Sequence, residues 1–229
     1  MPWFFHPMDF LIIIAFAVSL WAQFRVSSTF NLWAQVRASS GMSGYEAARR
    51  LLDRNGLYDV SIERVPGKLS DHYDPAARVV RLSPSVYDQS SISAISVACH
   101  EIGHAIQHQH AYPMLTLRHR MFPVVRFASG LAPLLLIGGF LFQSLNLIGA
   151  GIIFFTAAVA FQLVTLPVEF NASSRARDLM ISEALITRDE ERGVAKVLNA
   201  AALTYVAAAL ISLLELVKYI LIFNSSNRE

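Results

Sequence analysis

Charged residues and cysteine are both scarce in this chain of 229 residues. Only 16% of the residues are charged, 54% are hydrophobic, and the mean hydropathy is positive. This balance excludes an ordinary soluble domain and favours membrane segments joined to a water-facing part. The single cysteine, Cys99, excludes an intramolecular disulfide, as in a reducing compartment or a membrane. A net charge of +2 is nearly neutral, so we expect no nucleic acid or other polyanionic partner.

Charge is absent altogether from residues 127–168. A crossing needs about 20 residues at a rise of ~1.5 Å each, so this stretch is long enough for two spans. The polar step at 143–146 predicts a tight turn between them. Residues 10–24 and 199–223 are two further apolar stretches and predict a first and a fourth span. No Lys or Arg precedes Phe10, which favours an anchor over a cleaved signal peptide.

Lysine and arginine flank the predicted spans unevenly. They follow the first and third spans and precede the second and fourth, whereas the N-terminal tail and the 143–146 turn have none. The positive-inside rule therefore places both termini outside and the other flanking segments in the cytoplasm. The expected segments are an N-terminal transmembrane helix (1–24), a cytoplasmic domain (25–126), a transmembrane hairpin (127–168), a cytoplasmic helix (169–198) and a C-terminal transmembrane helix (199–223).

Two charged residues fall inside the fourth predicted span. Glu215 and Lys218 are about one helical turn apart, so they could pair with each other. They could equally lie near the outer interface, and they predict no function.

The segment after the first span is long enough for a small domain. Ser43 and Glu46 form a capping-box pattern that predicts a helix, and Asn55-Gly56 is typical of its end.

Two strands and a second helix are expected next. Residues 59–65 and 78–82 read as strands, separated by turn-like residues at 71–75. From about Ser91, apolar residues recur at steps of three and four, which predicts an amphipathic helix.

That helix carries the sequence His-Glu-Ile-Gly-His at 100–104. Residues four apart lie on one helical face, so His100 and His104 could both reach one Zn²⁺ at about 2.1 Å. The acid between them, Glu101, could polarise a metal-bound water and act as a general base. The five-residue pattern is short and also occurs by chance, but its place on an amphipathic helix after a strand favours a metal site.

His108 and His110 follow the motif, but we expect neither to bind the metal. On an unbroken helix His108 lies ~12 Å along the axis from His100 and ~80° around it. No glycine occurs between His104 and Gly130 to turn the chain back. We interpret both as polar residues near the helix end, where histidine also suits the helix dipole.

The third protein ligand must then come from elsewhere, and residues 166–177 are the best candidate. Pro167 is expected to end the third span, and Glu169 to open a polar helix on the same side of the membrane as His100. A glutamate there could equally serve only to favour a helix N-terminus.

Three segments together resemble the YugP-like neutral zinc metallopeptidase family of bacterial membranes. They are His-Glu-Ile-Gly-His-Ala at 100–105, Leu-Pro-Val-Glu-Phe-Asn-Ala-Ser at 166–173, and residues 198–208. The likeness covers nearly the whole chain. It implies a mainly α membrane protein with about four transmembrane helices and a small cytoplasmic α+β, zincin-like catalytic part that contains the HExxH helix.

The resemblance also implies a gluzincin-type site. It makes His100, His104 and Glu169 the ligands of one Zn²⁺ ion, with Glu101 as the general base. Ser173 stands where related gluzincins have an acid that bonds a ligand histidine.

The remaining site candidates concern the oxyanion and the groups that support the ligands. An oxyanion donor is needed for peptide hydrolysis. Asn171 stands where the family is expected to have Asp, which could alter the support of the ligands. The candidates are His72, Tyr73, Ser173, Arg175 and Arg177. A structural role in the turn would be simpler for His72 and Tyr73, and a role in the positive-inside charge would be simpler for the two arginines.

The expected function is that of a zinc-dependent endopeptidase in the bacterial inner membrane, with its catalytic site facing the cytoplasm. Its substrates would be peptides or proteins, membrane proteins included, and the lipid bilayer would be its surroundings. The strand at 78–82 could pair with an extended substrate. One alternative is an intramembrane-cleaving metalloprotease, which the serine and histidine content of residues 90–109 disfavours. Another is a zinc-stabilised scaffold without turnover, which would not need Glu101.

Overall fold

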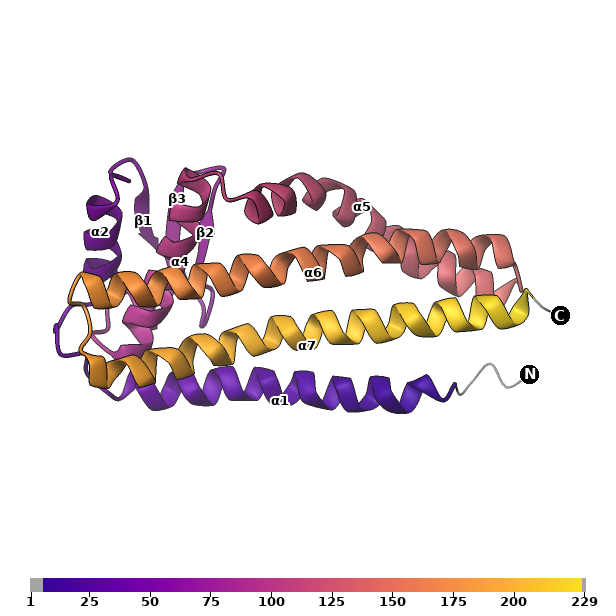
Figure 1. Ribbon diagram of the computed structural model, residues 1–229, viewed down its shortest axis with the longest axis horizontal. Coiled ribbons are helices and arrows are strands. Elements are labelled where there is room, and N and C mark those ends of the chain that lie inside the picture. The colour runs from indigo at the N-terminus through magenta and orange to yellow at the C-terminus, as the bar shows by residue number, and fades with distance from the viewer. Residues whose placement is uncertain (1–5, 228–229) are drawn as a thin grey trace. The chain divides into compact units, whose positions relative to one another are not determined.

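The computed structural model describes residues 6–227, which are mainly helical with one small sheet (Figure 1). The helices are α1 (Met8–Ala34), α2 (Gly44–Arg54), α3 (Pro84–Tyr87), α4 (Ile92–Gln109), α5 (Pro113–Leu141), α6 (Leu145–Ser182) and α7 (Arg188–Ser226). The strands are β1 (Ser61–Arg64), β2 (His72–Asp74) and β3 (Val79–Leu82).

The chain divides into two compact units. The first, called the apolar unit below, comprises Met1–Ala22, Thr116–Pro167 and Thr204–Glu229. The second, called the polar unit, comprises Gln23–Leu115 and Val168–Leu203.

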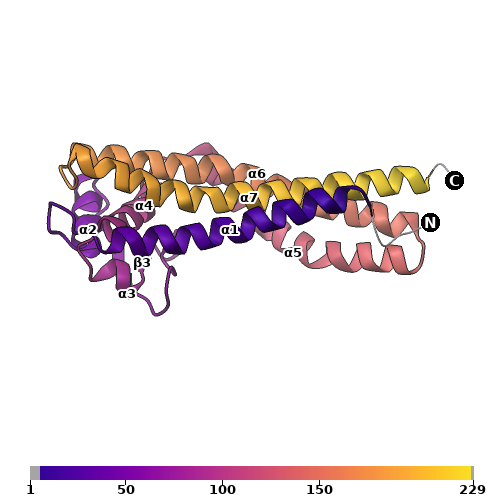
Figure 2. The same ribbon diagram turned by 90° about the horizontal axis from the view of Figure 1, so that it is seen from below.

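Four helices in the described part of the chain are long and apolar enough to cross a membrane, as the sequence predicts. They are α1, α5, α6 and α7. A tight turn joins α5 to α6 close to the predicted position (Figures 1 and 2). Its central residue, Gln143, has a φ of 55°. Gly139 lets α5 approach this hairpin partner closely, because a Cβ there would lie 2.8 Å from the backbone nitrogen of Ile148.

The third predicted span does not end at Pro167. This proline lies inside α6, so Glu169 sits within a continuous helix and does not open a new one. The helix N-terminus role considered for Glu169 is therefore wrong. Membrane helices tolerate proline because local adjustments and neighbouring groups re-satisfy the freed backbone carbonyl.

Lys218, one of the two charged residues inside the fourth predicted span, has a partner on another helix. The Lys218 ammonium group donates a hydrogen bond to the carboxylate of Asp9 at the start of α1. This contact joins two helices of the apolar unit that lie far apart in the sequence.

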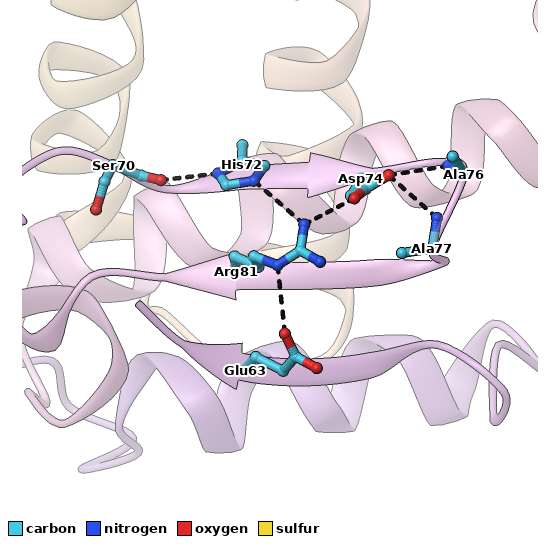
Figure 3. Close-up of polar contacts among 7 residues, drawn as sticks. All are labelled: Glu63, Ser70, His72, Asp74, Ala76, Ala77 and Arg81. Atoms are coloured by element: carbon cyan, nitrogen blue, oxygen red, sulfur yellow. Dashed lines mark hydrogen bonds and ion pairs between the residues drawn. The ribbon is translucent and has the colours of Figure 1, made fainter. Parts of the chain in front are cut away.

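The sheet of the polar unit has the strand order β1-β3-β2. β1 pairs parallel with β3, and β2 pairs antiparallel with β3. Residues 71–75 were expected to form a turn, but His72–Asp74 form a strand because β3 supplies them with backbone partners. The turn follows the strand: Asp74 Oδ1 accepts hydrogen bonds from the backbone N–H groups of Ala76 and Ala77 (Figure 3).

β3 cannot pair with a substrate, contrary to the sequence-based expectation. It is the central strand, and both its edges are already occupied by β1 and β2. An added strand would have to use the outer edge of β1 or β2.

Helices cover the sheet and form the core of the polar unit. The capping box of α2 is present as predicted: the Ser43 hydroxyl accepts from Glu46 N–H, and the Glu46 carboxylate accepts from Ser43 N–H. The core combines residues of α2, α4 and β3 with residues of α6 and α7, and its fully buried members contribute about 1.5–3 kcal/mol each. They include Leu51, Leu52, Val80, Ile95, Ile102, Met180 and Val194.

Candidate metal centre

Two histidines of α4 point to the same side of the helix. The helix begins at the cap Ser91, whose hydroxyl accepts from Ala94 N–H, and its apolar side packs in the core of the polar unit. His100 and His104 are one turn apart, and their ring centroids lie 4.8 Å from each other in an edge-to-face arrangement. The spacing of four residues therefore produces the predicted convergence of two imidazoles.

Glu169 of α6 meets these two histidines. Its Oε2 lies 3.3 Å from His100 Nε2 and 3.5 Å from His104 Nε2. One ligand atom from each of the three residues falls within 4.8 Å of the others, a grouping that could hold a metal ion. Glu169 is only 3% exposed, so its carboxylate lies in a buried site.

The short distance between α4 and α6 depends on a glycine inside the motif. A Cβ on Gly103 would lie 2.6 Å from the carbonyl oxygen of Ala172 and 3.1 Å from its Cα. No side chain fits between these two backbones. Gly103 therefore lets the two helices approach closely enough for Glu169 to reach both histidines.

Each histidine is held by a hydrogen bond at its other ring nitrogen. Ser173 Oγ lies 3.1 Å from His100 Nδ1, and Gln107 Oε1 lies 3.0 Å from His104 Nδ1. These contacts orient the Nε2 atoms toward Glu169. Metal-binding histidines in proteins are commonly oriented in this manner.

Electrostatics couple the carboxylate to the imidazoles. Burial alone would raise the pKa of Glu169, but the adjacent imidazoles of His100 and His104 outweigh burial and hold that pKa well below its usual range. For His104, burial lowers the pKa. The adjacent carboxylate of Glu169 and the negative charge of Glu101 raise it by more, so the pKa of His104 lies above its ordinary value. A site of this kind holds a positive charge, which a metal cation can supply in place of protons.

Glu101 is a second buried acid beside the cluster, with 8% of its surface exposed. Burial raises its pKa, the positive charges of His100 and His104 oppose that rise, and the negative charges of Glu169 and Asp71 add to it. A carboxylate with a raised pKa is better suited to take and return a proton near neutral pH than an exposed one.

The residues present fit a zinc ion. Zinc in catalytic sites commonly binds three protein ligands drawn from histidine nitrogen and carboxylate oxygen, and leaves a fourth position open. His100, His104 and Glu169 are of this kind, and one nitrogen or oxygen atom from each lies within 4.8 Å of the other two. The orienting contacts at both Nδ1 atoms complete the usual arrangement.

Two further candidates, His72 and Tyr73, belong to strand β2. His72 is on an exposed face of the sheet, where its Nδ1 is 2.8 Å from Ser70 O and its Nε2 is 3.5 Å from an Arg81 nitrogen (Figure 3). The Tyr73 hydroxyl lies 2.9 Å from His108 Nδ1, which joins β2 to α4. As predicted, His108 and His110 are outside the three-ligand cluster and lie near the helix end, with His110 at the C-cap of α4.

The two arginines of α6 are both engaged. Arg175 Nε donates to Asn171 Oδ1 at 2.8 Å, and an Arg177 terminal nitrogen donates to Glu191 at 2.7 Å. Asn171 thus accepts from Arg175 as an aspartate would, but without the charge.

Gln107 is the residue that the sequence interpretation missed. It is fully buried and contacts His104 directly. The only sequence signal was its position three residues after a ligand candidate on the predicted helix, which places both on neighbouring positions of one face.

Comparison with known proteins agrees with the sequence motifs. A family described as "Putative neutral zinc metallopeptidase" matches residues 8–224. The chain is 63% identical over 220 residues to the "Putative membrane protease YugP" of Bacillus subtilis (strain 168), covering 96% of this chain and 98% of that relative. No solved structure matches. From this match over nearly its whole length, the chain belongs to the family of neutral zinc metallopeptidases, whose name implies zinc as the cofactor.

Proposed function

We propose that this protein is a membrane-embedded zinc-dependent endopeptidase that hydrolyses peptide bonds at the cytoplasmic face of the bacterial inner membrane. The observation that carries the proposal is the convergence of His100, His104 and Glu169, with the buried acid Glu101 beside them. Three ligands alone would suit a structural metal as well. The additional acid is what hydrolysis requires and pure metal binding does not.

The roles of the residues follow from their positions. His100, His104 and Glu169 would hold one Zn²⁺, which when bound supplies Lewis acidity that polarises a peptide carbonyl and acidifies a water molecule. Glu101 takes a proton from the attacking water and passes it to the leaving amine. The raised pKa of Glu101, caused first by burial, favours this transfer in both directions.

The oxyanion donor that we propose is Tyr73. Its hydrogen bond with His108 holds it against α4, and burial raises its pKa, which keeps the hydroxyl protonated and able to donate. Arg175 and Arg177 are bound to Asn171 and Glu191, and we propose that they support the fold of α6.

The substrate is proposed to bind as an extended strand. Peptides commonly add to an exposed sheet edge through backbone hydrogen bonds. β2 is an edge strand, and its residue Tyr73 contacts α4, the helix that carries the motif. The outer edge of β2 therefore replaces β3 as the proposed docking strand.

The proposed orientation of the protein in the membrane rests on the distribution of lysine and arginine around the predicted spans. The positive-inside rule places the segments that carry the histidines and Glu169 on the same side, in the cytoplasm. Two predicted spans separate the segments, an even number, so both can contribute to one metal centre.

An intramembrane-cleaving protease is the first alternative. The motif lies on α4, which is not among the candidate spans in the described part of the chain. A cysteine in place of the exposed C-cap residue, His110→Cys, would react with a membrane-impermeant maleimide added from the cytoplasmic side of inverted vesicles. Protection from that reagent would favour the intramembrane alternative.

A zinc-stabilised scaffold without turnover is the second alternative, and peptide cleavage separates it from the proposal. The purified protein should cleave casein or a peptide library, and Glu101→Gln should reduce the rate by about 10²- to 10⁴-fold while zinc stays bound. Glu63→Gln, which changes an exposed acid of β1, is the matched control and should retain full activity. Bound zinc with no Glu101-dependent cleavage of any peptide would support the scaffold.

A further inference from the structure

Gln107 is a fully buried glutamine whose amide contacts three groups. Its Oε1 lies 3.0 Å from His104 Nδ1. Its Nε2 lies 2.8 Å from the backbone carbonyl oxygen of Val168 and 3.0 Å from Asn171 Oδ1. One side chain of α4 thus contacts a candidate ligand and two positions of α6 next to Glu169.

The partners of Nε2 fix which way the Gln107 amide faces. A glutamine amide has two hydrogens on nitrogen and none on oxygen. The carbonyl of Val168 can only accept, so it must face the Gln107 nitrogen. With the amide turned over, two oxygens would face each other in a buried place, which is costly.

The second partner, Asn171, is fixed in the same way. Its Oδ1 also lies 2.8 Å from Arg175 Nε, and a guanidinium can donate but never accept. The atom of Asn171 that faces Arg175 is therefore its oxygen, and this oxygen is also the acceptor for Gln107. Both hydrogens of Gln107 Nε2 are thus used, by acceptors that cannot exchange roles.

The consequence for His104 concerns its proton. Gln107 Oε1 can only accept, so His104 Nδ1 must donate and therefore carries hydrogen. The neutral imidazole then has its lone pair on Nε2, the atom 3.5 Å from Glu169. That is the nitrogen a metal needs in order to bind beside the carboxylate.

We propose that Gln107 is a positioning residue that locks His104 in the Nδ1–H tautomer and ties it to the register of α6 through Val168 and Asn171. This inference rests on the proposed metal centre but concerns a residue that the peptidase mechanism does not use. The chain from Arg175 through Asn171 and Gln107 to His104 holds the imidazole in its metal-binding form before any metal arrives.

The other histidine has no such lock. His100 Nδ1 faces Ser173 Oγ, and a hydroxyl can either donate or accept. The two ligand histidines should therefore differ: His104 has one tautomer, whereas His100 can adopt either until a metal selects one.

Nitrogen-15 NMR of the histidine rings in the metal-free protein tests this directly. The measurement is made at about pH 9, where imidazoles are neutral, and signals are assigned with single histidine variants. Wild-type His104 should carry its proton on Nδ1, and Gln107→Met should give a mixture of tautomers.

Zinc affinity supplies the second readout. Gln107→Met should weaken zinc binding by about 10- to 100-fold, as measured by competition with a chelator. Gln109→Met is the matched control on the same helix, because Gln109 donates to Asn55 O and is outside the cluster. Its zinc affinity should equal that of the wild type.

Two results would overturn the inference: His104 protonated on Nε2 in the metal-free wild type, or zinc binding by Gln107→Met within twofold of the wild type. A destabilised Gln107→Met variant leaves the inference testable, because the wild-type tautomer is measured separately. Failure of the wild type to bind zinc would overturn the proposed function alone, since the tautomer is read without the metal.

Discussion

The apolar and polar units use their helices in opposite ways. In the apolar unit, large hydrophobic side chains such as Phe10, Leu134 and Ile153 are 68–72% exposed, as expected for surfaces that meet lipid. Hydroxyl groups there bond back to their own helix, as Thr156 does to Ile152 O and Ser212 to Ala208 O. These hydroxyl groups are thus satisfied within their own helices, and the pair of Lys218 with Asp9 is a polar contact between two helices of this unit.

In the polar unit, polar groups of different helices are buried against one another. Glu101, Gln107 and Glu169 are 8%, 0% and 3% exposed, and their partners come from α4 and α6 together. The candidate chemistry therefore lies where helices must fit each other closely. Changes at such contacts should affect zinc, whereas changes within the apolar unit should not.

A large effect is expected for Gly103→Ala, which changes the backbone contact between α4 and α6. The new methyl group would clash with the Ala172 backbone and push α6 away, at a cost of about 1–3 kcal/mol in the free energy of unfolding. Zinc affinity should fall at least tenfold, by chelator competition. Gly130→Ala in α5 is the matched control, since a Cβ there meets nothing within 4 Å. Equal zinc affinities for the two variants would contradict the role of the close contact.

The pH dependence of stability should reverse when zinc is bound. In the metal-free protein the pKa of His104 lies above its ordinary value of 6.5, so the stability from its pair with Glu169 is present at lower pH and lost as pH rises through that raised pKa. Zinc instead requires neutral imidazole, so its stabilisation grows as pH rises. Thermal unfolding between about pH 6 and 8 should give opposite slopes with and without a chelator. Parallel slopes would argue against His104 as a ligand.

Ser173→Ala tests the contact that orients His100, in which a hydroxyl can either donate or accept. Loss of the hydroxyl beside His100 Nδ1 should lower zinc affinity by about tenfold, because it orients a ligand without touching the metal. Ser182→Ala changes an exposed serine of the same helix and should leave affinity unchanged. Isothermal titration with a competing chelator resolves the difference.

Lys218→Met should have the smallest effect on zinc. It breaks the ion pair with Asp9 and should destabilise the apolar unit by about 1–2 kcal/mol. Zinc content and peptide cleavage at a permissive temperature should match the wild type. Loss of zinc in this variant would show that the two units are more closely coupled than the comparison implies.

Much of the candidate site could be predicted because it depends on local spacing. The steps of three and four residues in α4 place His100 and His104 on one face, and the same geometry excludes His108. Glu169 was identified by its segment, although α6 runs through Pro167 and the expected helix start is absent. A proline in a membrane helix does not end it as reliably as in water.

The features that escaped prediction depend on partners distant in sequence. β2 has three residues of mixed polarity, and its strand conformation comes from β3. Gln107 carries no motif, and its role appears only when the carbonyl of Val168 and the amide of Asn171 lie beside it. Gly103 likewise matters because of Ala172, 69 positions further along the chain.

The central claim is that Glu169 completes one zinc site with His100 and His104, and the zinc content of Glu169→Ala tests it most directly. Metal per chain would be measured after dialysis of wild type and variant against the same weak chelator. The account predicts about one zinc ion per chain in the wild type and loss of zinc in the variant, because two histidines alone bind too weakly. Full zinc occupancy in folded Glu169→Ala would contradict it.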